Sequence, residues 1–131
     1  MLEGWSPHRE LLAAYNRVDL ALDTQPYSGG LTTCEALWMG VPVITFPGQT
    51  FAGRHSVSHL TNAGYPQFIA ADAAGYVDLA VQVAGRLDEL AAIRSQMREQ
   101  VKNSPLCDAP RFARDLLDVL RAVWESRVAA E

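Results

Sequence analysis

The sequence predicts an α/β fold in which helices flank a partial parallel sheet. Short apolar segments rich in β-branched residues alternate along the chain with longer segments whose apolar residues recur every three or four positions. The first pattern is typical of buried strands and the second of amphipathic helices, and their alternation indicates parallel βαβ units. A glycine-rich turn between one strand and the next helix adds a feature that such sheets use to bind ligands.

The expected elements follow one another from the N-terminus without an internal repeat. Each strand ends in loop-forming residues, and the helices begin near a capping residue or a proline. In chain order we expect a helix over 7–15, a strand over 18–22, a helix over 32–39, a strand over 43–46, a helix over 52–62, a strand over 67–70, a helical stretch over 73–102 and a final helix from 108.

Single residues mark the expected helix boundaries. Thr32 or Thr33 is expected to cap the helix over 32–39, and Gly40 to end it, because hydroxyl side chains and glycines have these roles at helix ends. Gly85 offers a point at which the stretch over 73–102 divides into two helices. The final helix carries an apolar face formed by Phe112, Leu116, Leu120 and Val123.

Three strands are fewer than a doubly wound sheet usually has, and residues 1–4 resemble the end of another strand. We therefore expect residues 1–131 to be a single fragment of a larger domain. In the usual strand order, the strand over 18–22 would lack a neighbour on one side. An uncovered apolar edge invites pairing with another molecule, so we expect either a homodimer through this edge or marginal stability.

Composition limits the classes of function. The chain has 131 residues and a net charge of −4, with 20% charged and 49% hydrophobic residues. This balance offers no basic surface for nucleic acid or for an anionic membrane. Cys34 and Cys107 belong to no metal-binding pattern, which favours free thiols in a reducing cytoplasm. The sequence has neither a signal peptide nor an apolar run long enough to span a membrane.

The run over 29–33, Gly-Gly-Leu-Thr-Thr, is the most informative candidate site. It joins a strand to a helix N-terminus, where unpaired N–H groups and the helix dipole favour a phosphate. Adjacent glycines let the backbone approach a ligand closely. Glu35, in the first helical turn, could accept hydrogen bonds from ribose hydroxyls. A plain capped helix, in which Glu35 only favours the dipole, is the alternative.

Two other patterns suggest sites that their details argue against. Gly48 and Gly53 have P-loop spacing, but Arg54 and His55 stand where a P-loop has lysine and a hydroxyl residue. His55 and His59 are four positions apart on an expected helix, which is a metal-ligand spacing. No third ligand accompanies them in the sequence, so we expect neither a triphosphatase nor a metal site.

Longer runs of sequence resemble a known family. These runs are WSPH at 5–8, VDLALD at 18–23, PYSGGLTTCEALWMGVPV at 26–43, AGR at 52–54, LTNAG at 60–64 and SPLCD at 104–108. Together they resemble the C-terminal catalytic lobe of bacterial O-GlcNAc transferase-like, SPINDLY-like proteins, which often carry tetratricopeptide repeats upstream. The resemblance covers nearly the whole chain.

The resemblance implies a GT-B fold, in which two Rossmann-like lobes enclose the active site. The chain would then be the donor-binding part of an inverting enzyme that transfers N-acetylglucosamine from UDP-N-acetylglucosamine to serine or threonine hydroxyls of a protein. The protein acceptor would be held through the other lobe. Such enzymes generally need no catalytic metal, because dipoles and side chains stabilise the leaving diphosphate.

Position by position, the resemblance assigns donor contacts to this chain. The loop that meets the uracil contains Ser6 and His8, and Glu35 matches a carboxylate that holds the ribose. The diphosphate loop matches Gly30, Leu31, Thr32 and Thr33, and Gly29 belongs to the same turn. At Leu11 and Gly30 some relatives have a histidine that this chain lacks, and Arg54 matches a residue with an electrostatic or structural role.

Family residues proposed for acceptor activation lie outside this chain, so we assign no catalytic residue and expect the isolated chain to be inactive. Two other functions remain open. The glycine turn and Glu35 would serve a GT-B transferase with a lipid, sugar or small-molecule acceptor equally well. The chain could also be a folded module without measurable ligand affinity, which a titration with a uridine nucleotide would distinguish.

Overall fold

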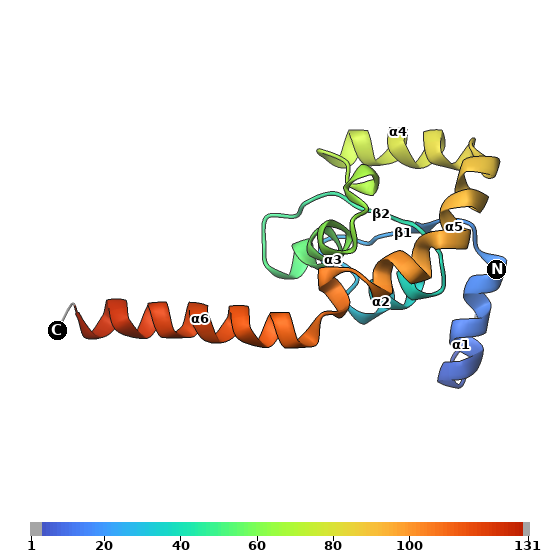
Figure 1. The fold of residues 1–131 in the computed structure, drawn as a ribbon. Helices are drawn as coiled ribbons and strands as arrows, with labels where there is room; N and C mark the ends of the chain where they lie inside the picture. Colours follow the sequence, from blue (N-terminus) through green and yellow to red (C-terminus); the bar gives the residue numbers. More distant parts are fainter. Residues whose placement is uncertain (1–3, 130–131) are drawn as a thin grey trace.

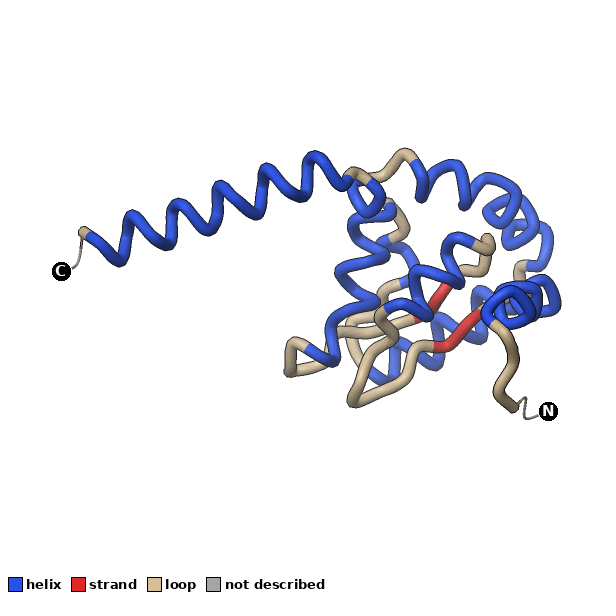
Figure 2. Tube along the Cα trace, turned by 90° about the horizontal axis from the view of Figure 1, so that it is seen from below, coloured by secondary structure: helices blue, strands red, loops and turns tan. Residues whose placement is uncertain are grey.

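The computed structural model describes residues 4–129, and it has a small parallel sheet surrounded by helices (Figures 1 and 2). Strand β1, Ala21–Leu22, pairs in parallel with β2, Val43–Ile44, with Ala21 opposite Val43. Both strands are shorter than expected. The predicted fold class, an α/β arrangement with a partial parallel sheet, is confirmed.

The third expected strand is reduced to a single bridge. Ile69 pairs in parallel with Thr45, whose N–H donates to the carbonyl of Phe68 at 3.1 Å and whose carbonyl accepts from Ala70 at 2.8 Å. The preceding residues, Pro66–Phe68, form a 3-10 turn instead of a strand. Proline has a fixed φ and no N–H to give to a ladder, so it favours a turn at this point. The order of the three segments is nevertheless the expected one.

The helices account for most of the described chain. The α-helices are α1 His8–Ala14, α2 Leu31–Trp38, α3 His55–Ala63, α4 Ala73–Ala84, α5 Leu87–Lys102 and α6 Ala109–Val128. Short 3-10 turns are η1 Tyr15–Arg17, η2 Ala52–Arg54, η3 Pro66–Phe68 and η4 Pro105–Cys107. The division of the long helical stretch at Gly85 is confirmed.

The core lies between β2 and the helices α2, α3 and α5. Leu37, Ile44, Leu60 and Met97, one from each of these elements, have no exposed surface, and Val101 is 2% exposed. Burying a side chain of this size contributes roughly 1.5–3 kcal/mol relative to leaving it in water. This packing holds the N-terminal ends of α2 and α3 close to the carboxyl ends of the two strands.

The start of α2 differs from the expected cap. Gly30 is the N-cap residue, and no side chain accepts a hydrogen bond there. Thr33, one of the two expected caps, instead lies inside the helix with its hydroxyl 2.8 Å from that of Ser56. The expected end of α2 is confirmed, because Gly40 adopts a φ of +79° immediately after it.

Helix α6 leaves the body of the protein and points away from it (Figures 1 and 2). Every residue of this helix is exposed, and near its start Phe112 borders a pocket that is also lined by α3 and η4. The amphipathic pattern was predicted, but most of the apolar face remains exposed. The exposed large side chains are Phe112, Leu116, Leu117, Val119, Leu120, Val123, Trp124 and Val128.

The N-terminal side of the sheet is also open. Within residues 4–129, β1 pairs only with β2, and the side chain of Leu22 is 56% exposed. The remnant strand expected over 1–4 falls almost entirely outside the described residues. Among the helices that are described, none combines the length and the apolar character needed to cross a bilayer.

Gly40 and Gly85 provide a matched pair for testing the helix ends. A Cβ on Gly40 would lie 3.0 Å from the backbone oxygen of Arg94, at a φ of +79°. Gly40→Ala is therefore expected to lower the free energy of unfolding by about 1–2 kcal/mol. At Gly85 φ is −78° and the nearest atom would be 3.6 Å away, so Gly85→Ala should be neutral or slightly stabilising. Urea unfolding followed by circular dichroism would measure both, and equal losses would contradict this account.

Candidate functional site

The structure brings together two of the segments singled out from the sequence. Nε2 of His8, the first residue of α1, lies 2.8 Å from Oε1 of Glu35 on α2. The Glu35 side chain is 10% exposed and that of His8 is 69% exposed, so the carboxylate is partly enclosed while the imidazole faces solvent. The pair places a carboxylate and an imidazole, both able to form hydrogen bonds, near the N-terminus of α2.

The glycine turn lies next to this pair, at the N-terminus of α2. A Cβ on Gly29 would lie 2.5 Å from Oγ1 of Thr33 and 3.0 Å from Oγ1 of Thr32, so a side chain at this position would displace its neighbours. Because no side chain caps Gly30, the first N–H groups of α2 keep the positive end of the helix dipole open to a ligand. Leu31 and Thr32 are exposed.

Asp23 fixes the turn to the sheet. This residue follows β1 directly and is 9% exposed. Its Oδ1 accepts a hydrogen bond from the N–H of Gly29 at 2.7 Å. Its Oδ2 accepts from the hydroxyls of Ser28 at 2.8 Å and Thr45 at 2.6 Å. A buried carboxylate is costly unless it is hydrogen-bonded, and these three donors satisfy it.

Ser56, near the start of α3, extends the network to the second helix. Its N–H donates to Oγ of Ser28 at 2.9 Å, and its hydroxyl donates to the carbonyl of Gly29 at 3.1 Å. Oγ of Ser56 also lies 2.8 Å from Oγ1 of Thr33, which is 3% exposed. The hydroxyl of Thr33 is thus used inside the protein, whereas Thr32 is exposed and its hydroxyl has no hydrogen-bond partner among the described residues.

A cavity of about 380 Å³ lies beside the His8–Glu35 pair. Its walls are largely apolar and come from α1, α2, α5 and η4, with lining residues His8, Leu12, Leu31, Cys34, Glu35, Trp38, Val101, Leu106 and Cys107. Burial raises the pKa of the Cys34 thiol, and the nearby charges of Cys107 and Glu35 raise it further. Cys34 thus forms part of the apolar wall of this cavity.

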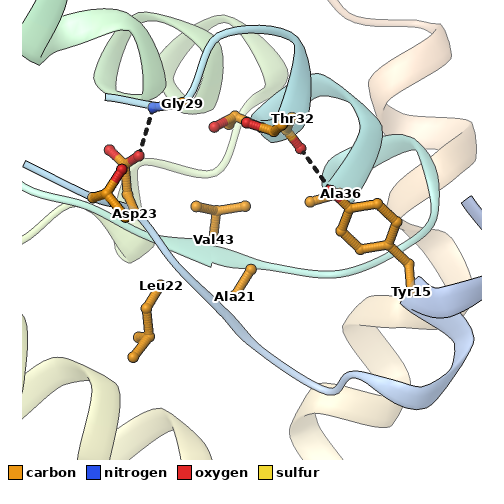
Figure 3. Close-up of a pocket in the computed structure, with 10 residues that line it drawn as sticks. Tyr15, Ala21, Leu22, Asp23, Gly29, Thr32, Ala36 and Val43 are labelled. Atoms are coloured by element: carbon orange, nitrogen blue, oxygen red, sulfur yellow. Dashed lines mark hydrogen bonds between the residues drawn. The ribbon is translucent and has the colours of Figure 1, made fainter. Parts of the chain in front are cut away.

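A second, smaller pocket of about 180 Å³ lies on the β1 side of the turn (Figure 3). The carbonyl of Thr32 accepts from the Tyr15 hydroxyl at 3.2 Å, and Asp23 accepts from Gly29 on the opposite wall. Burial, followed by the charge of Glu35, raises the pKa of Tyr15. The lining of this pocket includes Gly29, Thr32 and Thr33, so it opens onto the glycine turn itself.

Some residues predicted from sequence are not joined to the others. Ser6 is half-buried and makes no hydrogen bond among the described residues. The rings of His55 and His59 lie 6.5 Å apart, and no group of three or more metal-ligating side chains gathers anywhere in residues 4–129. Burial lowers the pKa of His59, with His55 adding to the effect.

The sequence analysis missed the roles of Asp23 and Ser56 in holding the turn. The position of Asp23 at the end of a strand was a signal that could have indicated its role.

Asp23→Asn is expected to lower the free energy of unfolding by about 2 kcal/mol. The substitution removes a charged acceptor and brings an amide N–H₂ group towards hydroxyls that need an acceptor. Asp19→Asn is the control, because Asp19 is exposed on the same segment. Amide exchange at Gly29 should quicken only in the Asp23 variant. Unchanged exchange at Gly29 would show that the carboxylate does not hold the turn.

Comparison with known proteins identifies the family of this site. The sequence model of glycosyl transferase family 41 matches residues 6–116, a range that contains Ser6, His8, the glycine turn and Glu35. The match therefore includes every residue proposed from sequence for donor binding. It ends within α6.

Similar proteins carry consistent names. A probable UDP-N-acetylglucosamine–peptide N-acetylglucosaminyltransferase SPINDLY from Eustoma exaltatum subsp. russellianum is 43% identical over 113 residues, or 86% of this chain. The probable SPINDLY protein of Arabidopsis thaliana is 38% identical over 120 residues, 92% of this chain. A UDP-N-acetylglucosamine–peptide N-acetylglucosaminyltransferase from Caenorhabditis elegans is 32% identical over 107 residues, 82% of this chain. This chain spans only 12%, 13% and 9% of their respective lengths.

The similarity extends to three dimensions. A mutant O-GlcNAc transferase from Thermobaculum terrenum superposes with a TM-score of 0.82 at 40% sequence identity, over 92% of this chain and 23% of that one. The fold is thus that of a fragment of a GT-B O-GlcNAc transferase, as the sequence predicted. With a family match over most of its length and relatives at about 40% identity, the chain belongs to glycosyl transferase family 41, a family of glycosyltransferases.

Proposed function

We propose that this chain is the donor-binding part of a protein O-glycosyltransferase. The donor that it binds is a UDP-sugar, UDP-N-acetylglucosamine. Its membership of glycosyl transferase family 41 supports the reaction class, and the names of its relatives support this donor and a peptide acceptor. The transfer would invert the anomeric centre of the sugar. The observation that carries the proposal is the contact between His8 and Glu35, because it joins the two predicted donor segments.

The ribose is proposed to lie against the Glu35 carboxylate. Oε1 of Glu35 is already oriented by His8 at 2.8 Å, and a carboxylate can accept further hydrogen bonds through its remaining lone pairs. Ribose presents two neighbouring hydroxyl donors that such a group can hold. The uracil would then lie against the loop that contains Ser6, at the entrance to α1.

The diphosphate is proposed to lie at the start of α2, on the turn formed by residues 29–33. The open N–H groups of this helix favour negative charge, and the Thr32 hydroxyl can add a donor. In a site partly shielded from water, such dipoles stabilise the charge that develops on a leaving UDP. The proposal therefore includes no metal cofactor.

The acceptor and the transfer step lie beyond this part of the enzyme. The chain spans about an eighth of the length of the SPINDLY relatives, so the groups that position an acceptor hydroxyl are proposed to lie outside these 131 residues. Positioning supplies much of the rate of such reactions, so the chain alone is proposed not to transfer sugar. A cytoplasmic location belongs to the same proposal and agrees with the free thiols of Cys34 and Cys107.

Calorimetric titration of the chain with UDP tests the donor role. Wild type should bind UDP, and Glu35→Ala should weaken binding by on the order of 1–3 kcal/mol, because the ribose loses its acceptor. Glu10→Ala is the matched control, since Glu10 is an exposed carboxylate in the first turn of α1. Equal affinities of the two variants for UDP would show that Glu35 does not bind the ribose. Absence of UDP binding by the wild-type chain would contradict the whole proposal.

The open edge of β1 is proposed to pair with a second copy of the chain or to leave it marginally stable. Within the described residues this edge has no strand partner, and Leu22 beside it is 56% exposed. Light scattering should then show a dimer that Leu22→Lys dissociates, because a lysine on an edge strand opposes pairing. A stable wild-type monomer with strong amide protection on both sides of residues 18–22 would contradict the proposal.

A further inference from the structure

His55 is the first residue of α3, and its imidazole reaches the space above the glycine turn. A Cβ built on Gly30 would lie 3.8 Å from Nδ1 of His55, with no other atom within 4 Å. The space in front of Gly30 is therefore open except for this nitrogen. An imidazole from α3 borders the position to which a side chain at residue 30 would point.

Neighbouring rings hold this imidazole in place. The ring of Phe51 packs edge-on against it with centroids 4.8 Å apart, and Tyr27 packs similarly at 5.9 Å. Neither ring nitrogen of His55 has a hydrogen-bond partner within residues 4–129. Tyr27 and Phe51 are 65% and 85% exposed, so the group faces outward from the protein.

The backbone beside His55 is fixed to the same turn. Ser56 donates its N–H to Ser28 at 2.9 Å and its hydroxyl to the carbonyl of Gly29 at 3.1 Å. The imidazole thus keeps its position relative to the turn, because the two segments share buried hydrogen bonds. A group held in this way can make a specific contact without a large loss of conformational entropy.

We propose that His55 is a donor-binding residue that hydrogen-bonds the diphosphate of the nucleotide sugar from the α3 side. The inference rests on the proposed donor function, and it adds a residue to which that proposal gives no role. Imidazole always carries at least one N–H donor, and its protonated form adds a positive charge opposite the phosphate oxygens. The diphosphate would lie between the N-terminus of α2 and this ring.

Two neighbouring groups fit this role less well. His59 lies one helical turn further along α3, and no atom of it lies within 4 Å of a Cβ built on Gly30. Arg54 is exposed at the end of η2, and no atom of it lies within 4 Å of a Cβ built on Gly30. The nitrogen of His55 lies beside that position and has no hydrogen-bond partner among the described residues.

The test compares ligands with and without phosphates on the 131-residue chain. His55→Ala should weaken UDP binding by about tenfold and leave uridine binding unchanged, because only UDP carries the phosphate that the imidazole contacts. His59→Ala is the control, since it removes the same side chain one turn away, and it should change neither affinity. Thermal unfolding of each variant would verify that the chain remains folded.

A double variant separates a contact from a structural effect. His55→Ala combined with Gly30→His is designed to place an imidazole in the same space from the other side, where a Cβ on Gly30 would lie 3.8 Å from Nδ1 of His55. The preference for UDP over uridine should return in this variant, and its failure to return would count against the inference.

Other outcomes decide between this inference and the donor function. Equal losses for UDP and uridine in His55→Ala, or no loss for either, would overturn the role of His55 while the donor function stands. Absence of UDP binding by the wild-type chain would overturn both.

Discussion

The buried carboxylate of Asp23 is the constraint on which the rest of the site depends. It accepts hydrogen bonds from Gly29 in the turn, Ser28 in the loop and Thr45 on the neighbouring strand segment. Removing any of these donors would leave buried charge less well satisfied, so the turn and the sheet are held as one unit. The N-terminus of α2 therefore has a defined position before any ligand arrives, which lowers the entropic cost of binding.

The helices could be predicted from the sequence because their signals are local. The stops at Gly40 and Gly85 follow from residue type and periodicity alone. The strands could not be delimited, because pairing depends on which partner is present and how long it runs. The segment over 67–70 has an apolar pattern, yet Pro66 begins a 3-10 turn, and only Ile69 pairs. The face of α6 was predictable, but its packing was not, since any partner is remote in sequence.

The location of the candidate site could be predicted from the expected topology of the sheet. The turn before α2 follows the carboxyl end of β1, where parallel sheets bind ligands. The contact between His8 and Glu35 then joins the start of α1 to this helix. Side-chain partners within that edge are set by three-dimensional packing. Thr33 illustrates the limit, because its hydroxyl was expected to cap α2 and instead lies 2.8 Å from that of Ser56, 23 residues away.

The same Ser56 explains how two helices can act on one ligand. Its hydrogen bonds join the start of α3 to Ser28 and Gly29, so the ring of His55, which lies beside Gly30, keeps a fixed position relative to the start of α2. Replacing His55 would remove a contact to phosphate and leave the positions of the two helices unchanged. Only a ligand that carries phosphate should therefore bind more weakly. Replacing Asp23 would instead move the turn, so the affinities for uridine and for UDP should both fall. Selectivity between uridine and UDP therefore distinguishes contact from positioning within one network.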